Sequence, residues 1–185
     1  MHKEQLSLLV EEGHPAYEWA KKQSDSVSAF GHIGTHIDCY GSEPDKAKYE
    51  VEAVVLDCTN RMPLLTDIER LNISGKALVL FTGNIEKNNY GTLDYGTMDT
   101  SITEEILECI LEKTPAFIVI DSYGIGAHGD EHIQFDKSCE SNGCFVIENV
   151  NLSKAVVGKI KKLQINFDKS STSTGKKCHL TAVCA

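Results

Sequence analysis

Three short apolar runs constrain the fold more than any other feature of this sequence. They lie in KALVLFTGN at 76–84, PAFIVID at 115–121 and GCFVIENV at 143–150, and a polar residue follows the apolar stretch of each, namely Thr82, Asp121 and Glu148. Apolar runs of this length without alternation are typical of strands that are buried in a sheet. We therefore expect a sheet with three buried strands, two of which deliver a carboxylate at or near their ends.

The rest of the chain adds further strands and helices around these runs. The helix predicted at 101–113 has apolar residues at helical spacing, and Ser101 and Glu104 match a capping box at its start. Residues 3–22 are expected to be helical, with a break near Gly13 and Pro15, and show no clear first strand. Further strands are predicted at 49–58, 163–167 and 178–185, and a short helix at 66–71. The pattern indicates a strand-rich α/β domain.

Length and charge narrow the class of protein. A chain of 185 residues with 41% hydrophobic and 24% charged residues fits one domain over 1–185. Its net charge of -9 would repel phosphate groups and anionic lipids, so we expect neither a nucleic-acid partner nor a membrane partner. No apolar run approaches the roughly 20 residues of a membrane span, and the first residues alternate in charge. We expect a cytoplasmic protein.

The cysteines do not suggest a zinc ribbon or a redox site. There are seven of them, an odd number, and no two form a C-x-x-C pair. We expect them to be reduced and to pack as small apolar residues. Cys39 is the exception to consider, because it adjoins Asp38.

The segment FGHIGTHID at 30–38 carries metal-ligand chemistry. In an extended strand, residues two apart share a face, so His32, Gly34, His36 and Asp38 would point the same way. Two imidazoles and one carboxylate suit zinc, manganese or iron and leave coordination positions open. The alternative is a pair of surface histidines in a glycine-rich loop. Asp38 and the small Gly34-Thr35 step favour the metal site.

These residues resemble a known signature. HIGTHID is similar to the H-x-G-T-H-x-D motif of the kynurenine formamidase and putative cyclase family, which also includes isatin hydrolase. Further similarities follow in the family's order, at LVLFTGN, FIVIDS, CFVIENV and the C-terminal GKKCHLTAVCA. The resemblance runs from Phe30 to the end of the chain.

The resemblance implies a swivelling β/β/α domain with a mostly mixed sheet and flanking helices, assembled as a homo-oligomer, a dimer or a tetramer. It implies hydrolysis of a small amide with one or two divalent ions, Zn²⁺ or Mn²⁺. By residue match, His32, His36 and Asp38 would hold one ion, and a second would be bridged by Asp38 and bound by Glu148. A metal lowers the pKa of bound water from about 15.7 toward 7, which makes hydroxide available as nucleophile.

The sequence departs from the family motif at positions that matter. The motif continues with a proline and a histidine, the expected proton-transfer group, where this chain has Tyr40 and Ser42. A serine hydroxyl cannot act as a general base near neutral pH. The histidine of the second metal falls on Asp136, whose carboxylate could still bind zinc or manganese.

Two histidines are candidates for the missing proton-transfer role. His128 and His132 belong to GAHGDEH at 126–132, a glycine-containing loop after the strand that ends at Asp121. We prefer His132, because it is nearer to Asp136. The alternative is that this segment is a polar surface loop.

Two functions stay open. The first is a metal-dependent hydrolase that cleaves a small amide, N-formyl or cyclic, and the second is a non-catalytic family member that binds a metal or ligand and lost hydrolysis with the motif histidine. The retained ligands favour the first, and Ser42 favours the second. Three tyrosines, Tyr90, Tyr95 and Tyr123, could line a pocket for a flat substrate or pack in the core.

Overall fold

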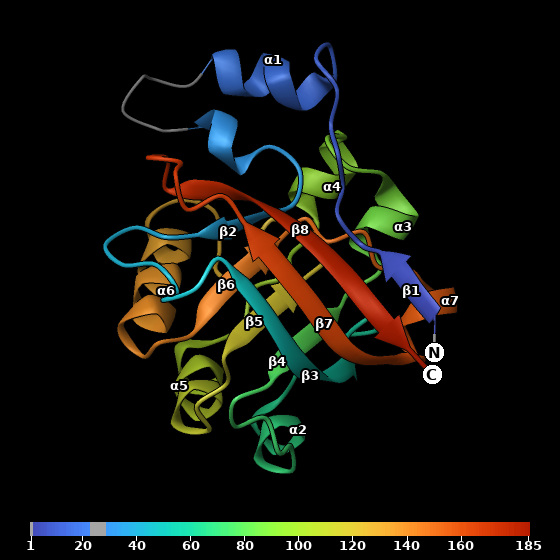
Figure 1. Cartoon of the computed structure of the whole chain (residues 1–185), viewed down its shortest axis with the longest axis vertical. Helices are drawn as coiled ribbons and strands as arrows, with labels where there is room; N and C mark the ends of the chain where they lie inside the picture. The colour runs from blue at the N-terminus through green and yellow to red at the C-terminus, as the bar shows by residue number, and fades with distance from the viewer. Residues whose placement is uncertain (1, 23–28) are drawn as a thin grey trace.

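A mixed sheet of eight strands organises residues 2–22 and 29–185, which the computed structural model describes (Figure 1). The strands follow the order β1-β8-β2-β6-β5-β4-β3-β7, and β7 also pairs with β8, so the sheet closes on itself like a barrel. The predicted α/β class with a mixed sheet and flanking helices is confirmed. The strands are β1 His2–Gln5, β2 His36–Asp38, β3 Lys48–Asp57, β4 Ala77–Phe81, β5 Phe117–Ile120, β6 Phe145–Glu148, β7 Ile160–Phe167 and β8 Gly175–Cys184.

The three apolar runs form the centre of the sheet, as predicted. β4, β5 and β6 run parallel to one another, β3 runs parallel to β4, and every residue of β4, β5 and β6 is buried. The carboxyl ends of parallel strands meet at one edge, where open α/β sheets commonly place their functional residues. Thr82, Asp121 and Glu148 lie at this edge.

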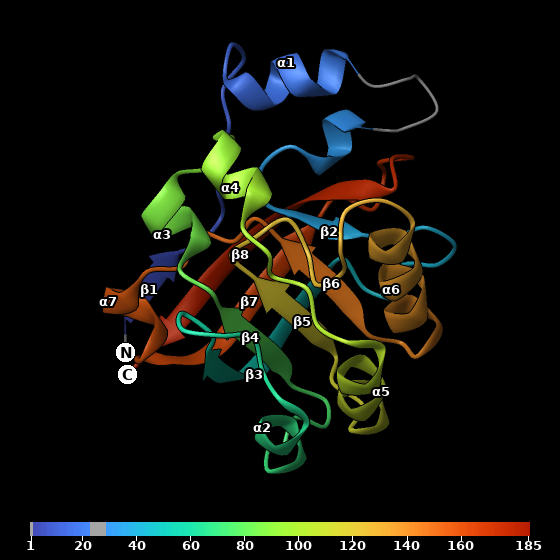
Figure 2. The same ribbon diagram turned by 180° about the vertical axis from the view of Figure 1, so that it is seen from behind.

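Helices cover one face of the central strands, and the long antiparallel strands cover the other (Figures 1 and 2). Ile68 of α2, Ile110 of α5 and Cys139 of α6 belong to the apolar cluster on the first face. Leu163 of β7 and Leu180 of β8 belong to the cluster on the second face. The helices are α1 Pro15–Lys21, α2 Leu65–Glu69, α3 Asn84–Asn88, α4 Leu93–Thr97, α5 Glu104–Glu112, α6 Asp130–Ser141 and α7 Lys154–Val157, with a 3-10 helix, η1, at Ala29–His32.

The helix predicted over 3–22 is wrong in its first half. His2–Gln5 form β1, which pairs antiparallel with β8, and only Pro15–Lys21 are helical in this region. Leu6 is 1% exposed and its N–H donates to the carbonyl of Leu180, whereas Leu9 is 74% exposed. The backbone of this segment therefore obtains its hydrogen bonds from β8 and not from a helix.

Two predictions of local structure also need correction. The helix at α5 begins at Glu104 with Thr103 as its cap, since the Thr103 hydroxyl accepts from the Ile106 N–H, and Ser101 instead donates to Asp99. The segment predicted as a loop at 126–132 runs into α6, which begins at Asp130. This helix is mostly polar and buries only a narrow stripe, Phe135, Asp136 and Cys139, so its periodicity in the sequence is weak.

All seven cysteines are free thiols, as predicted. Six of them are buried, and Cys109 is partly exposed. Burial raises the pKa of Cys39 to about 12, so this side chain stays a neutral thiol near neutral pH. A neutral thiol is a poor nucleophile, so Cys39 is not suited to act as one.

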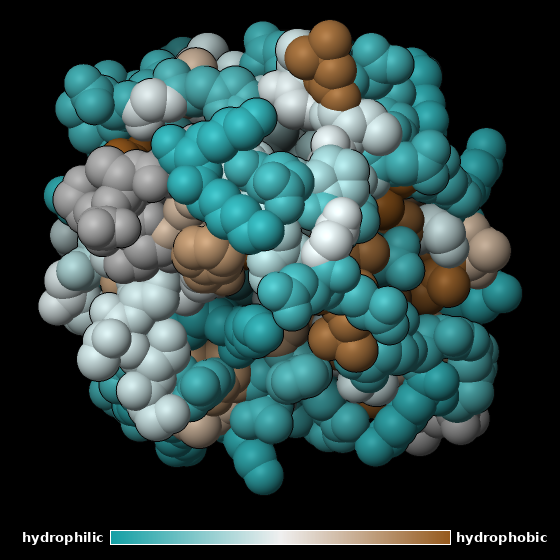
Figure 3. All heavy atoms as spheres, turned by 90° about the horizontal axis from the view of Figure 1, so that it is seen from above, coloured by the Kyte–Doolittle hydropathy of each residue, from teal (hydrophilic) through white to brown (hydrophobic). Residues whose placement is uncertain are grey.

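The surface seen from the α1 end is mostly hydrophilic, with separate hydrophobic patches (Figure 3). Among the exposed apolar side chains of the molecule are Leu9, Trp19 and Phe30, which expose 74%, 49% and 52% of their surface. Within the described ranges, no helix has the length and apolar character required to cross a membrane.

Asp121 ties the ends of β4 and β5 together. Its buried carboxylate accepts hydrogen bonds from the N–H and hydroxyl of Thr82, both at 2.7 Å, and from the N–H of Gly83 at 2.8 Å. Burial raises the pKa of Asp121 to about 6, although these three donors act in the opposite direction. At neutral pH the ionised carboxylate fixes the turn that follows β4.

We expect Asp121→Asn to lower the free energy of unfolding by about 1–3 kcal/mol, because the new amide group would face an N–H donor without an acceptor. Urea unfolding monitored by circular dichroism at pH 7.5 measures the change. Asp45→Asn, at an exposed position, is the matched control. Equal midpoints for the two variants would contradict this role of Asp121.

Candidate metal centre

The short strand β2 brings the histidine motif next to Glu148. It lies between β6 and β8, in antiparallel pairing with both, and His36 stands directly opposite Glu148 of β6. His36, Asp38 and Glu148 are all at most 3% exposed. The pairing register therefore places a motif imidazole and the strand-end carboxylate side by side inside the protein.

His32, His36 and Asp38 form a first donor group. The Nδ1 atom of His32 lies 3.1 Å from Oδ1 of Asp38, and the Nε2 atom of His36 lies 3.5 Å from the same oxygen. The two imidazole nitrogens are 3.2 Å apart. Three potential ligand atoms thus converge on one point, in an arrangement that could hold a metal ion.

We predicted that His32 would lie on the same face of one strand as His36 and Asp38, and this is wrong. Only His36–Asp38 are extended, whereas His32 ends the 3-10 helix η1. The chain turns at Gly34, which has φ +70° and where a Cβ atom would lie 2.5 Å from the carbonyl oxygen of Leu8. A turn that requires glycine therefore brings the two imidazoles together.

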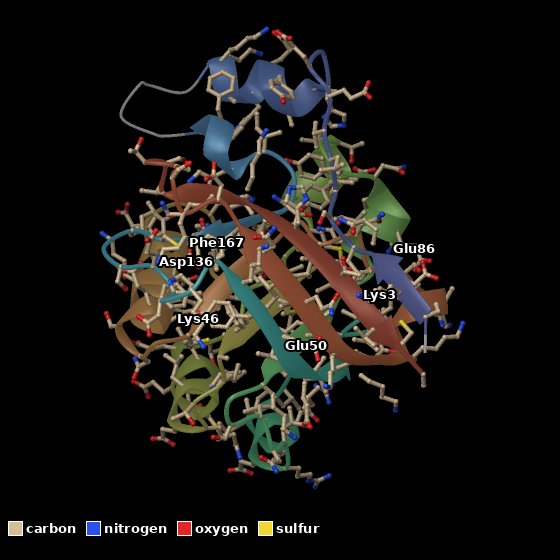
Figure 4. The ribbon with its side chains drawn as sticks, in the orientation of Figure 1. Lys3, Lys46, Glu50, Glu86, Asp136 and Phe167 are labelled. Atoms are coloured by element: carbon tan, nitrogen blue, oxygen red, sulfur yellow. The ribbon has the colours of Figure 1, made fainter. Side chains whose placement is uncertain are left out.

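His132, Asp136 and Glu148 form a second donor group beside the first. The Nε2 atom of His132 lies 3.3 Å from Oδ2 of Asp136 and 3.5 Å from Oε1 of Glu148. His132 and Asp136 are one turn apart on α6, and Figure 4 labels Asp136 on this helix. A Cβ atom at Gly124 would lie 2.4 Å from His132 and 2.6 Å from Glu148, so the loop after β5 needs glycine there.

Glu148 connects the two donor groups. Its Oε2 atom lies 3.4 Å from Nε2 of His36 in the first group, and its Oε1 atom faces His132 in the second. The structure thus brings all five predicted metal ligands, His32, His36, Asp38, Asp136 and Glu148, into one region together with His132. It does not bring His128 there: this exposed side chain stacks on Tyr123 with ring centroids 4.0 Å apart, and its Nε2 atom lies 2.7 Å from the carbonyl oxygen of Gly96.

The carboxylates of these groups fit a bound cation. Apart from these imidazole contacts, both oxygens of Asp38, both oxygens of Asp136 and Oε1 of Glu148 are buried without a hydrogen-bond partner among residues 2–22 and 29–185. Buried carboxylate oxygens are normally hydrogen-bonded, because removing them from water is costly. Imidazole and carboxylate donors are those that zinc and manganese accept. The donor set therefore suits a divalent metal.

The carboxylates also perturb one another. Burial, reinforced by the charge of Asp38, raises the pKa of Glu148 to about 8, and the same two causes raise the pKa of Asp136 well above its ordinary value. Burial lowers the pKa of His36, but Asp38 and Glu148 outweigh this effect and raise it well above the usual range. Without a cation, the centre therefore holds protons that a bound metal would displace.

A layer of hydrogen bonds behind the motif orients His36. Its Nδ1 atom donates to the carbonyl of Gly34 at 2.9 Å, which leaves Nε2 facing the carboxylates. Asn149 donates to the same carbonyl at 3.0 Å and accepts from the Tyr95 hydroxyl, and the Tyr90 hydroxyl accepts from the Gly34 N–H at 2.9 Å. These two tyrosines therefore support the motif.

The three tyrosines were predicted either to line a substrate pocket or to pack in the core, and they differ in this respect. Tyr95 is only 5% exposed and packs in the core. Tyr90 lines a cleft of about 730 Å³ between residues 8–14 and α3, and none of the six donor residues lines this cleft. Tyr123 packs against His128.

The two departures from the motif lie on the loop after β2. Ser42 is exposed, and Tyr40 is partly buried, with Nζ of Lys137 located 5.7 Å from the centre of its ring. Burial and the negative charges of Asp38, Asp136 and Glu148 raise the pKa of Tyr40, so its hydroxyl keeps its proton.

Sequence reasoning did not place His132 in a donor group, although its spacing of four from Asp136 was a usable signal for a helix face.

We expect Asp136→Asn to stabilise the metal-free protein by about 1–3 kcal/mol at pH 8, because it replaces a buried carboxyl whose ionisation the folded protein disfavours. The folded-state pKa of Asp136 is raised, so its ionisation costs stability as the pH rises. The gain should therefore shrink toward pH 4, where the wild-type carboxyl is protonated. Urea unfolding in EDTA at both pH values measures the gain in the free energy of unfolding, with Asp45→Asn as control. A variant less stable than wild type at pH 8 would contradict the argument.

Comparisons with known proteins agree with this fold. The sequence model of the putative cyclase family matches residues 5–127, more than half of the chain, whereas no curated protein gives a significant match. A potential metal-dependent hydrolase with cyclase activity superimposes with a TM-score of 0.71 at 17% identity, over 98% of this chain and 96% of that chain.

Two further solved structures have the same fold. A predicted metal-dependent hydrolase from Bacillus stearothermophilus has a TM-score of 0.70 at 17% identity, over 98% of this chain and 97% of that chain. Isatin hydrolase A from Labrenzia aggregata has a TM-score of 0.70 at 14% identity, over 98% of this chain and 93% of that chain. With the family match over residues 5–127, these observations lead to one conclusion: the chain belongs to the putative cyclase family.

Proposed function

We propose that this protein is a metal-dependent hydrolase that cleaves the carbon–nitrogen bond of a small amide, N-formyl or cyclic. The observation that carries the proposal is the pair of adjoining donor groups, with five buried carboxylate oxygens that lack hydrogen bonds. The metal-dependent hydrolases and the isatin hydrolase among the proteins of the same fold support it.

The two donor groups have separate roles in this proposal. His32, His36 and Asp38 would hold one divalent ion, Zn²⁺ or Mn²⁺, and His132, Asp136 and Glu148 would hold a second. Bound there, a divalent ion supplies a Lewis acid that acidifies water and polarises an amide carbonyl. The hydrogen bond from His36 Nδ1 to Gly34 orients the imidazole for this task.

We infer that His132 moves a proton when only the first group is occupied. Its Nε2 atom lies between the carboxylates of Asp136 and Glu148, and its side chain is 18% exposed. Burial lowers the pKa of His132, which favours the neutral imidazole that can accept a proton near neutral pH. Nε2 could then pass this proton to the leaving amine. With the second group occupied, the same atom is a ligand instead.

The non-catalytic alternative has one observation in its favour. Ser42, at the place of the motif histidine, is exposed, and no described contact joins its side chain to either donor group. A protein that binds metal and hydrolyses no amide would be this second candidate.

Protein purified without a chelator should contain zinc or manganese in near-stoichiometric amounts. His36→Ala and Asp38→Ala should lose it, because each removes a donor of the first group, whereas His128→Ala should keep it, since His128 lies outside both groups. Inductively coupled plasma mass spectrometry measures the content. Metal-free protein that takes up neither ion on loading would overturn the proposal.

The metal-loaded protein should hydrolyse at least one member of a panel of N-formyl and cyclic amides, and His36→Ala should abolish this turnover. His128→Ala should retain it. Liquid chromatography of the products measures the reaction. Full metal occupancy without turnover on the whole panel would favour the non-catalytic alternative.

A further inference from the structure

A single carboxylate on α6 holds the loop that follows the first donor group. Glu140 accepts hydrogen bonds from three successive backbone N–H groups, those of Tyr40, Gly41 and Ser42, each at 2.7 Å. Hydrogen bonds to an ionised acceptor are shorter and roughly twice as strong as those between neutral groups. Three of them on one side chain make a strong tether between helix and loop.

Among the described residues, no strand accepts hydrogen bonds from the N–H groups that Glu140 binds. The N–H of Cys39 still bonds to the carbonyl of Thr174 beside β8, but the next three N–H groups turn to the helix. A proline at position 40, as in the family motif, has no N–H to donate. Tyr40 has one, and Glu140 accepts from it. The chain thus fixes this loop by hydrogen bonding to a neighbouring helix.

The hydrogen bonds of Glu140 connect the segments that carry the two donor groups. The loop begins directly after β2, which ends in Asp38 of the first donor group, and α6 carries His132 and Asp136 of the second. Lys137 of the same helix contacts the ring of Tyr40, which adds a second contact between helix and loop. Figure 1 shows this loop running along α6.

Glu140 is not needed to hold the helix on the sheet. Phe135 and Cys139 are buried in the apolar cluster that includes Ile118 and Val146 of the central strands. This packing is independent of the carboxylate. Loss of Glu140 should therefore release the loop and leave α6 in place, so the effect on the metal centre can be measured in a folded protein.

We propose that Glu140 is a positioning residue of the metal centre, which sets the separation between Asp38 and the ligands of α6 by holding the loop at 40–42. The inference rests on the proposed metal binding, and Glu140 itself belongs to neither donor group. Residues that orient metal ligands in this way typically change metal affinity by 10- to 100-fold when replaced, so an effect on the order of 10–100-fold is expected.

The test measures zinc affinity by competition with a chelator. Glu140→Ala should weaken zinc binding by about 10–100-fold, and Glu140→Gln by less, because the amide oxygen can still accept from part of the loop. Glu108→Gln, on the exposed side of α5, is the charge-matched control and should bind like wild type. Hydrogen exchange should become faster at the amides of 40–42 in Glu140→Ala and stay unchanged in the control.

A second control separates positioning from general stability. Ile110→Val removes a buried methylene from α5 and should lower the urea midpoint without touching the loop, so its zinc affinity should equal that of wild type. Equal losses of affinity in Ile110→Val and Glu140→Ala would overturn the inference, as would unchanged affinity in Glu140→Ala. In both cases the proposed function would stand. Wild-type protein that binds no zinc or manganese would instead overturn the proposed function together with this inference.

Discussion

The antiparallel pairing of β2 with β6 and β8 is the contact on which the candidate site depends. β2 has only three residues, yet it joins the parallel strands to the antiparallel ones and sets His36 opposite Glu148. A shift of one residue would turn each side chain of β2 to the other face of the sheet. Ile37 would then leave the core and the two ligands would enter it. Burial of Ile37 therefore enforces the register that the chemistry requires.

The same arrangement concentrates negative charge where it is costly. Asp38, Asp136 and Glu148 are each at most 3% exposed, and most of their oxygens lack hydrogen bonds. A domain stable by only about 5–15 kcal/mol can retain such a group when something compensates for the charge. The imidazoles do so in part. A bound cation would neutralise the remaining negative charge and so raise the free energy of unfolding of the folded protein.

Sequence reasoning found what local chemistry determines and missed what distant contacts determine. The strands within 76–84, 115–121 and 143–150 were predictable because continuous apolar runs leave few alternatives. The strand at His2–Gln5 was not, because its hydrogen bonds come from β8, at the far end of the chain. The helix of His132 and Asp136 was missed because its buried stripe includes a carboxylate, which periodicity counts as polar. The motif residues were found from their types, but the turn at Gly34 required coordinates.

The position of β8 in the sheet has a consequence for biosynthesis. β2 is made early in translation, but one of its two partners is Gly175–Cys184, which leaves the ribosome after all of the candidate ligands. β1 also cannot pair until β8 has been made. Because long-range pairing forms late, the histidine motif must remain without this neighbour until β8 has been made. A nascent chain can thus expose its imidazoles and carboxylates before the pocket around them exists, and metal capture should follow the pairing of β8 with β2.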